Sequence, residues 1–480
     1  MSTLKRFFKD TIIYGIASVL PRVVTILLLK LKTTVFGSET FSVDVTYYIY
    51  AAYLNVLLTY GMETAFFRFF TKEKDKGKVI STTFVSLLAT TLLFLIFGLY
   101  FADNLSVFFG FSSPLFLKLL ILTIFFDTLV VIPFAYLRVS NRPIRFAFYK
   151  IGNILIYAFF VIFFLWIAPK YEIKLPTIIS NIFGETPKII YVFLAGVIAS
   201  IVTFIAMLPI IFKFKLEFDK QIFKKLLYYS LPIMIGGFAY VTNENLDKLL
   251  LKNMIGESES GIYAACYKLG VFMMIFITAF RMGAEPFFFN HSNKKNAKTT
   301  YATILTYFTI FGALFMFVIV AYIQLFAKII IGRDEYLQAL NIVPIILLAN
   351  LILGIYHNLS IWYKLTDKTK YGMYISVSGA IITVVLNLIF IPLYGYMASA
   401  WATLFVYSSM TLASYLLGKK HYPVPYQFNK VFLYLGILVV FSYISFSLFQ
   451  ENYYISTLLL ITFTGIIYTL EKETIRNILT

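Results

Sequence analysis

The chain contains 480 residues, of which 60% are hydrophobic and 13% are charged, and its mean hydropathy is +0.83. These values exclude an ordinary soluble domain. Long apolar segments recur to the end of the chain, whereas a transmembrane β-barrel would alternate polar and apolar residues in runs of about ten. The sequence therefore predicts an all-α polytopic membrane protein.

The formal net charge is +18, which in a soluble protein would suggest nucleic-acid binding. Here the basic residues lie in short segments between apolar spans, where they set the membrane orientation, and no nucleic-acid partner is expected. The single cysteine, Cys266, excludes a disulfide within the chain and a zinc or iron–sulfur ligand set. No cofactor is expected.

Fourteen segments are apolar and long enough to cross a bilayer, which takes roughly 20 residues. In chain order they are predicted at 11–34, 43–67, 79–101, 114–137, 146–168, 188–212, 222–252, 261–286, 299–325, 337–362, 371–392, 395–417, 429–448 and 453–470. No small-residue cleavage site follows the first segment, so we interpret it as an uncleaved span.

Basic residues concentrate in the even-numbered loops and at both ends of the chain. The loop at 71–78, with the sequence TKEKDKGK, is an example. The odd-numbered loops, to which we also assign Lys32, hold far fewer. Because Lys and Arg favour the cytoplasmic side, an even number of spans predicts that both termini are cytoplasmic.

Two pairs of segments resemble each other in sequence. Residues 136–165 and 362–391 both run from an aromatic and a basic residue, through a polar cluster, to a glycine inside the next span. Residues 30–48 likewise align with 250–268. We therefore predict that the first six spans are duplicated as the next six.

Six spans per half give both halves the same topology, related by a pseudo-twofold axis along the membrane normal. Two further helices follow. The predicted domains are an N-terminal six-helix bundle at 1–220, a C-terminal six-helix bundle at 221–420 and two additional transmembrane helices at 421–480. Two packed halves with a seam between them are the parts of an alternating-access transporter.

The first and seventh spans, which are equivalent in this repeat, contain helix-breaking residues. Pro21 lies in the first, and Pro232, Gly236 and Gly237 lie in the seventh. Interrupted spans at equivalent places in two halves point to a substrate site. We therefore expect both helices to be broken and to line a polar cavity.

Ionisable residues concentrate in the first two spans of each predicted half. A charge at mid-membrane costs about 3 kcal/mol on insertion scales, so such residues usually face a wet cavity or one another. A buried Arg or Lys suits an anionic ligand such as a phosphate. The candidate substrate-binding cations are Arg22, Lys268 and Arg281. The candidates for a coupling sodium ion or proton are Glu63, Glu244, Asp247 and Glu285.

Several of these charges also have a purely structural interpretation. Arg281 and Glu285 are four residues apart and can form an ion pair on one helix face. Glu63 and Arg68 lie near the end of their span and can extend to the cytoplasmic interface. Asp247 lies near the outer end of its span and can be interfacial.

Tyrosines crowd the same spans. A tyrosine can stack on a sugar face and form hydrogen bonds with hydroxyl groups. The candidate sugar-contacting residues are Tyr53, Tyr240 and Tyr267. The alternative for each is packing or anchoring at the membrane interface.

Two stretches resemble bacterial polysaccharide-repeat (Wzx-like) flippases of the multidrug/oligosaccharidyl-lipid/polysaccharide exporter superfamily. They are KDTIIYGIASVLPRVVTILLLKLKTTVFG near the N-terminus and ENLDKLLLKNMIG…GIYAACYKLGVFMMIFITAFRMGAEPFFF across the seventh and eighth spans. The fourteen spans and the repeat fit this family over essentially the whole chain. The resemblance implies a MATE-like fold in the bacterial cytoplasmic (inner) membrane.

The resemblance also implies an activity. Such proteins move an undecaprenyl-diphosphate-linked oligosaccharide to the outer leaflet for lipopolysaccharide, capsule or exopolysaccharide biosynthesis, with membrane lipids and other polysaccharide-assembly proteins as partners. Related lipid II flippases use cavity arginines on helices 1, 2 and 8. By position, Arg22 matches the arginine on helix 1 and Arg281 matches the arginine on helix 8. The second span departs from that pattern, because its middle holds Tyr50, Tyr53 and Asn55.

Two other functions remain open. The embedded acids favour an ion-coupled multidrug exporter of organic cations with the same fold, whereas the embedded cations favour the flippase. A membrane-embedded glycan polymerase would be an enzyme, but the sequence has no Asp-x-Asp pair, and His291, His357 and His421 lie far apart. We therefore expect a transporter and not an enzyme.

Overall fold

The computed structural model describes residues 3–479, except residues 175, 178, 180, 181, 183–186, 293, 367 and 451. The described elements are α-helices with short 3-10 and π-helical segments, which confirms the predicted all-α class. By contacts the chain divides into two compact units, Met1–Gly261 and Ile262–Thr480. The predicted boundary at 220/221 concerns a sequence repeat, which a division by contacts does not test.

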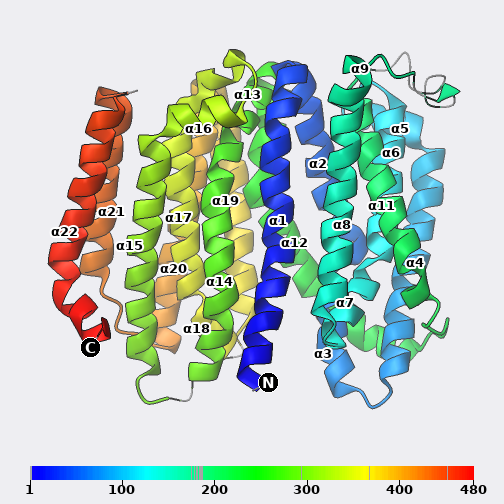
Figure 1. Ribbon diagram of the computed structural model, residues 1–480. Coiled ribbons are helices and arrows are strands. Elements are labelled where there is room, and N and C mark those ends of the chain that lie inside the picture. The colour runs from blue at the N-terminus through cyan, green and yellow to red at the C-terminus, as the bar shows by residue number, and fades with distance from the viewer. Residues whose placement is uncertain are drawn as a thin grey trace. The chain divides into compact units, whose positions relative to one another are not determined.

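The first unit runs from α1 into the start of α13 (Figure 1). Its elements are α1 (Thr3–Val35), α2 (Ser38–Thr59), α3 (Met62–Lys72), α4 (Lys76–Tyr100), α5 (Ala102–Phe108), α6 (Pro114–Leu129), α7 (Val131–Val139), α8 (Pro143–Ile162), the π-helical η1 (Phe163–Ile167), α9 (Ala168–Lys170), α11 (Ile190–Ile211) and α12 (Lys220–Met254).

The second unit holds the rest of the chain. Its elements are α13 (Glu257–Tyr267), which begins in the first unit, the 3-10 turn η2 (Lys268–Gly270), α14 (Val271–His291), α15 (Ala297–Ala321), α16 (Ile323–Ile330), the 3-10 segment η3 (Asp334–Ile342), α17 (Val343–Leu359), α18 (Ile361–Leu365), α19 (Lys370–Tyr394), α20 (Tyr396–His421), α21 (Phe428–Tyr443), the π-helical η4 (Ile444–Leu448) and α22 (Tyr453–Leu479).

Large side chains fill two apolar cores in the first unit. Phe116, Tyr157 and Phe193 bring α6, α8 and α11 together around one core. Phe66 and Ile132 lie in the other, where α3, α4 and α7 meet. Lipid tails are as apolar as these side chains, so close van der Waals packing, and not exclusion from water, holds such helices together.

The two C-terminal helices belong to the second unit. Both α21 and α22 pack on α15. Phe317 of α15, Phe441 of α21 and Phe463 of α22 form a cluster of edge-to-face rings, with centroids 5.9–6.2 Å apart. Next to them, α17 and α19 pack on α20.

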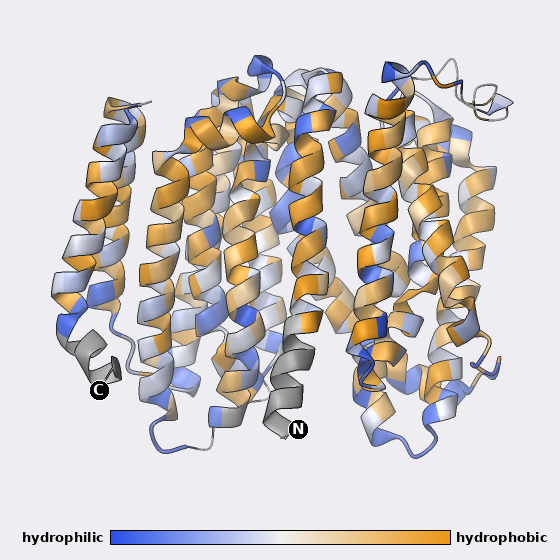
Figure 2. Ribbon diagram, in the orientation of Figure 1, coloured by the Kyte–Doolittle hydropathy of each residue, from blue (hydrophilic) through white to orange (hydrophobic). Residues whose placement is uncertain are grey.

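Within the described residues, twelve helices are long and apolar enough to cross a membrane. Each of the twelve coincides with a predicted span. Two predicted spans have no counterpart among them: 43–67, which corresponds to α2 and α3, and 222–252, which corresponds to α12. With 22 residues in α2 and 35 in α12, length is not the reason. Both carry several polar and charged side chains, among them Asp44 in α2 and Asp247 and Lys248 in α12, whereas most of the helices are dominated by hydrophobic residues (Figure 2). A total of fourteen spans therefore stays a prediction.

The predicted breaks in the first and seventh spans are wrong. α1 continues through Pro21, and α12 continues through Pro232, Gly236 and Gly237. A proline removes one backbone hydrogen bond, and in a membrane helix neighbouring groups can satisfy the carbonyl that it frees.

Interruptions occur instead in other spans, among them the second and the eighth. Tyr60 and Gly61 separate α2 from α3 with φ angles of 33° and 72°. Gly61 lies so close to α12 that a Cβ there would be 2.6 Å from the carbonyl oxygen of Ser230. The 3-10 turn at Lys268–Gly270 separates α13 from α14, and such turns inside helices often mark a hinge or local strain. The second helix of each predicted half thus contains a break, and so does the fourth, where Val130 separates α6 from α7 and Ser360 separates α17 from α18.

Successive spans run in opposite directions within each unit (Figure 1). In the first unit, the loops after α3, α7 and α11 therefore fall at one end. In the second unit, the loops after α14, α18 and α20 likewise fall at one end of that unit. These are the lysine- and arginine-rich loops of the sequence, so each unit keeps the charge asymmetry from which the orientation was predicted.

Candidate functional site

A charged cluster lies in the second unit, where α14, α17 and α18 meet. Nη2 and Nε of Arg281 donate to Oε1 of Glu285, one turn further along α14, at 2.8 and 3.0 Å. Nζ of Lys364 on α18 donates to the same oxygen at 2.9 Å. Nη1 of Arg281 lies 3.5 Å from Nε2 of His357 on α17. One carboxylate oxygen thus serves two cations.

The cluster is partly accessible, although α14 belongs to a candidate membrane span. The exposed fractions of the Arg281, Glu285 and Lys364 side chains are 38%, 36% and 27%. Charged groups that face hydrocarbon are costly, so accessible ones within a span are expected to face water. The sequence predicted the Arg281–Glu285 pair as one interpretation, but it missed Lys364, which we had placed in a loop, and His357.

A second ion pair lies inside α12. Nζ of Lys248 is 3.0 Å from Oδ1 of Asp247 and 2.8 Å from the backbone oxygen of Glu244. The side chains of Lys248 and Asp247 are only 6% and 4% exposed. Asp247 is therefore enclosed by protein, near the C-terminal end of α12, and its interpretation as an interfacial residue stays a prediction. Glu244 is half-buried on the same helix.

Glu63 forms an ion pair with Arg138 of α7, a partner that the sequence did not indicate. Its Oε1 accepts a hydrogen bond from Nη1 of Arg138 on α7 at 2.8 Å, and both side chains are more than 40% exposed. Arg68 lies instead over the ring of Tyr229, 4.3 Å from its centroid. Glu63 is thus a partly exposed partner of a cation at the start of α3.

The remaining predicted cations occupy different settings. Arg22 is half-buried on α1, one residue after Pro21. Lys268 is exposed and forms the first residue of the 3-10 turn η2. Lys268, which was selected as an ionisable residue inside an apolar span, thus lies where the eighth span changes from α-helix to 3-10 helix.

The three predicted tyrosines differ in accessibility. The hydroxyl of Tyr53 on α2 donates to Oγ1 of Thr242 on α12 at 3.1 Å. Tyr240, also on α12, is 48% exposed, whereas Tyr267 is 8% exposed and packs beside Tyr263 with ring centroids 5.7 Å apart. Tyr240 therefore presents the most ring surface to a ligand, and Tyr267 serves mainly in packing.

The sequence missed a buried ion pair between Lys32 and Asp44. We had assigned Lys32 to an external loop, and this is wrong, because it lies inside α1 with its Nζ 2.9 Å from Oδ2 of Asp44 on α2. The two side chains are 8% and 7% exposed. Nζ also lies 5.1 and 5.7 Å from the ring centroids of Tyr48 and Tyr157, which are joined by a 2.8 Å hydrogen bond.

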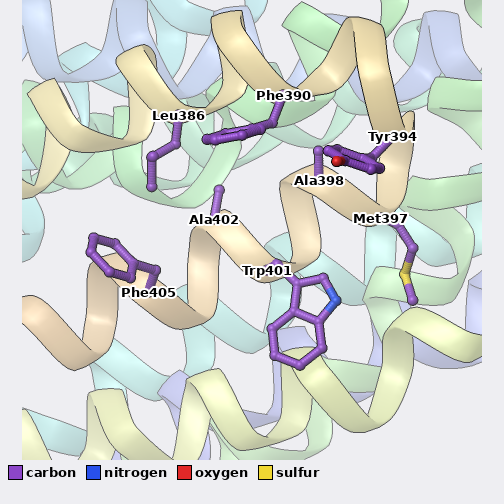
Figure 3. Close-up of a pocket in the computed structure, with 8 residues that line it drawn as sticks. All are labelled: Leu386, Phe390, Tyr394, Met397, Ala398, Trp401, Ala402 and Phe405. Atoms are coloured by element: carbon purple, nitrogen blue, oxygen red, sulfur yellow. The ribbon is translucent and has the colours of Figure 1, made fainter.

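Among the residues that the structure describes, no three His, Cys, Asp or Glu side chains are grouped so as to hold a metal ion. An apolar cavity of about 720 Å³ lies along α19 and α20 (Figure 3). The residues that line it are Leu386, Phe390, Tyr394, Met397, Ala398, Trp401, Ala402 and Phe405. This cavity has no charged side chain in its lining, so it offers no ionic site.

Comparison with known proteins adds a family match and one curated relative. A protein-family model named MatE matches residues 232–389. An uncharacterized membrane protein of Methanocaldococcus jannaschii is 27% identical over 261 residues. That match covers 51% of this chain and 61% of the relative, less than two thirds of its length.

Solved structures match nearly the whole chain. The inward closed conformation of the lipid II flippase MurJ has a TM-score of 0.72 at 17% identity and covers 95% of this chain and 99% of its own. An inward-facing multidrug resistance MATE family transporter of the MOP superfamily has a TM-score of 0.66 at 11% identity, covering 83% and 94%. A MOP superfamily transporter from Pyrococcus furiosus has a TM-score of 0.55 at 11% identity, covering 86% and 95%. The chain therefore has the fold that MurJ shares with the MATE family transporters.

Proposed function

We propose that this protein is a flippase that moves a lipid-diphosphate-linked oligosaccharide, of the undecaprenyl type, across the cytoplasmic membrane. The two predicted six-helix halves, 1–220 and 221–420, alternate their access to the two sides. The sugar and the diphosphate cross in a polar cavity while the lipid tail stays in the bilayer. Both chain termini face the cytoplasm, and other polysaccharide-assembly proteins supply and consume the substrate.

The observation that carries this proposal is the accessible cluster of Arg281 and Lys364 in a fold that matches a lipid II flippase over 95% of the chain. Because two cations share one carboxylate, the cluster has a net charge of one positive unit, which suits an anionic headgroup. Arg22 and Lys268 are further cavity cations in this proposal, and Tyr53, Tyr240 and Tyr267 are sugar-facing or supporting residues.

The alternative, a multidrug exporter of organic cations, rests on the same fold and on the embedded acids. Three of those acids already hold a cation, because Glu63 pairs with Arg138, Asp247 with Lys248, and Glu285 with both Arg281 and Lys364. A carboxylate held in this way is a poor site for an organic cation unless its partner leaves. Glu63, Glu244, Asp247 and Glu285 remain candidates for a coupling sodium ion or proton.

The test is translocation in proteoliposomes. A labelled lipid-diphosphate oligosaccharide is loaded in one leaflet, and its arrival in the other leaflet is followed with a reagent that cannot cross the membrane. Arg22→Ala and Arg281→Ala should each lower the rate at least about tenfold while the protein still inserts and stays folded, since each removes a cation that is proposed to bind the diphosphate. Arg145→Ala, at an exposed position in the first turn of α8, is the matched control and should transport normally.

Normal rates in both cavity variants would remove these arginines from the mechanism. A protein that moves a cationic dye, and leaves the lipid-linked oligosaccharide where it was loaded, would be a multidrug exporter. A purified protein that lengthened the glycan unaided would be a polymerase.

A further inference from the structure

We infer that Arg281 and Lys364 form the binding site for a phosphate group of the substrate, and that Glu285 is an internal anion which occupies this site until the phosphate displaces it. This inference rests on the proposed function and deepens it. It adds Lys364, which sequence reasoning did not select, and it gives Glu285 a role other than ion coupling.

The geometry of the hydrogen bonds is the first argument. Nε and Nη2 of Arg281 and Nζ of Lys364 all lie 2.8–3.0 Å from the single oxygen Oε1 of Glu285. Three N–H donors from two helices thus converge on one point. A non-bridging phosphate oxygen at that point would meet the same donors, with the planar guanidinium engaging phosphate oxygens as it engages a carboxylate.

The charge balance is the second argument. Arg281 and Lys364 together carry two positive charges, and Glu285 returns one, so the cluster is positive by one. A diphosphate carries more negative charge than one carboxylate and offers more acceptor oxygens. It is therefore the better partner for two convergent cations, and His357, 3.5 Å from Nη1 of Arg281, adds a polar neighbour.

The third argument is that the exchange requires no movement of the backbone. Glu285 is 36% exposed and is bound through side-chain atoms alone, one helical turn from Arg281. A rotation about its side-chain bonds carries the carboxylate away from the cations. Ion pairs that are exposed to this degree contribute little to folding stability, so the fold does not depend on keeping the carboxylate in place.

Binding of inorganic pyrophosphate to the purified protein, measured by calorimetry, tests the inference. Glu285→Gln removes the competing charge and should raise the affinity about tenfold, whereas Lys364→Gln should lower it about tenfold in both the wild-type and the Glu285→Gln background. Lys368→Gln is the matched control, because Lys368 is an exposed lysine four residues further on whose Nζ contacts Nδ1 of His421 at 2.9 Å and not Glu285.

Unchanged or weaker pyrophosphate binding by a folded Glu285→Gln protein would overturn the inference. If that variant does not fold, Glu285→Asp serves instead, because its shorter side chain cannot bridge both cations and should also bind pyrophosphate more tightly. Equal affinity in the Lys364→Gln and Lys368→Gln proteins would likewise overturn it.

Farnesyl diphosphate, as a second probe, distinguishes a lipid headgroup from a free anion. Since the substrate is proposed to be a lipid diphosphate, it should bind more tightly than pyrophosphate, and equal affinities would contradict a lipid source. Pyrophosphate binding that follows the expected pattern, without translocation of any lipid-linked oligosaccharide, would leave the site standing and overturn the proposed function. Translocation that is insensitive to Lys364→Gln and Glu285→Gln would leave the proposed function standing and overturn the phosphate site.

Discussion

At the residue scale, the buried pair of Lys32 and Asp44 joins α1 to α2. Its two side chains are less than 10% exposed, and two tyrosine rings lie beside the ammonium group. Removal of one partner from a buried pair leaves an uncompensated charge, which costs about 3–5 kcal/mol, whereas replacement of both by apolar groups is often neutral.

We therefore predict that Lys32→Met and Asp44→Leu each lower the free energy of unfolding by about 3–5 kcal/mol. The detergent-purified variants should accordingly unfold at a lower temperature. The double variant Lys32→Met/Asp44→Leu should recover most of this loss. Thermal unfolding of the three variants, with Lys30→Met as a partly exposed control on the same helix, measures the coupling. A double variant as unstable as the sum of the two singles would show that the pair is not coupled.

The charges of the site show where inference from sequence ends at this scale. A spacing of four residues was enough to pair Arg281 with Glu285, because neighbours on one helix face can be counted. The Nζ atom of Lys364 reaches the same carboxylate from 79 residues away in the chain. Arg138 is similarly 75 residues from Glu63. Contacts of this kind depend on how helices pack, which spacing in the sequence does not encode.

At the element scale, apolar length predicted the spans well, since hydrocarbon demands continuous apolar helices. It did not predict where helices break. Pro21 and Pro232 suggested breaks that are absent. The break at Tyr60 and Gly61 involves a non-glycine residue in the left-handed region, which tertiary contacts must stabilise. Helix breaks thus follow from packing as much as from local preference.

Gly261 lies where α13 crosses the start of α2, and it has no room for a side chain. A Cβ there would overlap the carbonyl oxygen of Ser38, which is backbone and cannot rotate aside. We predict that Gly261→Ala destabilises the protein by about 1–3 kcal/mol through this overlap, measured by thermal unfolding.

Gly283→Ala is the matched control. It lies in α14 with no atom within 4 Å of the added Cβ, so it should be neutral or slightly stabilising, because alanine favours a helix over glycine. Equal unfolding temperatures for Gly261→Ala and Gly283→Ala would contradict the close approach.

At the scale of the whole molecule, one contact joins two segments that the predicted repeat aligns. Residues 30–48 and 250–268 were aligned by sequence, and Oγ of Ser38 and Oγ of Ser258, from these two segments, lie 2.8 Å apart. Segments related by a twofold axis meet each other where they approach that axis. The pseudo-twofold repeat itself stays a prediction.

If the two halves separate at this contact during transport, a covalent link should stop the cycle. We predict that Ser38→Cys/Ser258→Cys forms a disulfide under oxidation and that translocation then falls at least about tenfold, with recovery under reductant. The native Cys266 is buried and its Sγ lies 3.0 Å from the backbone oxygen of Tyr336, so it should not compete. Full activity of the cross-linked protein, with each single-cysteine variant as the reference, would contradict the need for this separation.

The 3-10 turn at Lys268–Gly270 also changes how a helical wheel of this region must be drawn. Three residues at about 120° each, in place of about 100°, advance the following helix by roughly 60° and lengthen it by roughly 1.5 Å relative to an unbroken α-helix. A single wheel through residues 257–289 would thus misplace Arg281 and Glu285 by about one sixth of a turn. Angular assignments on α14 should be counted from Val271 onward.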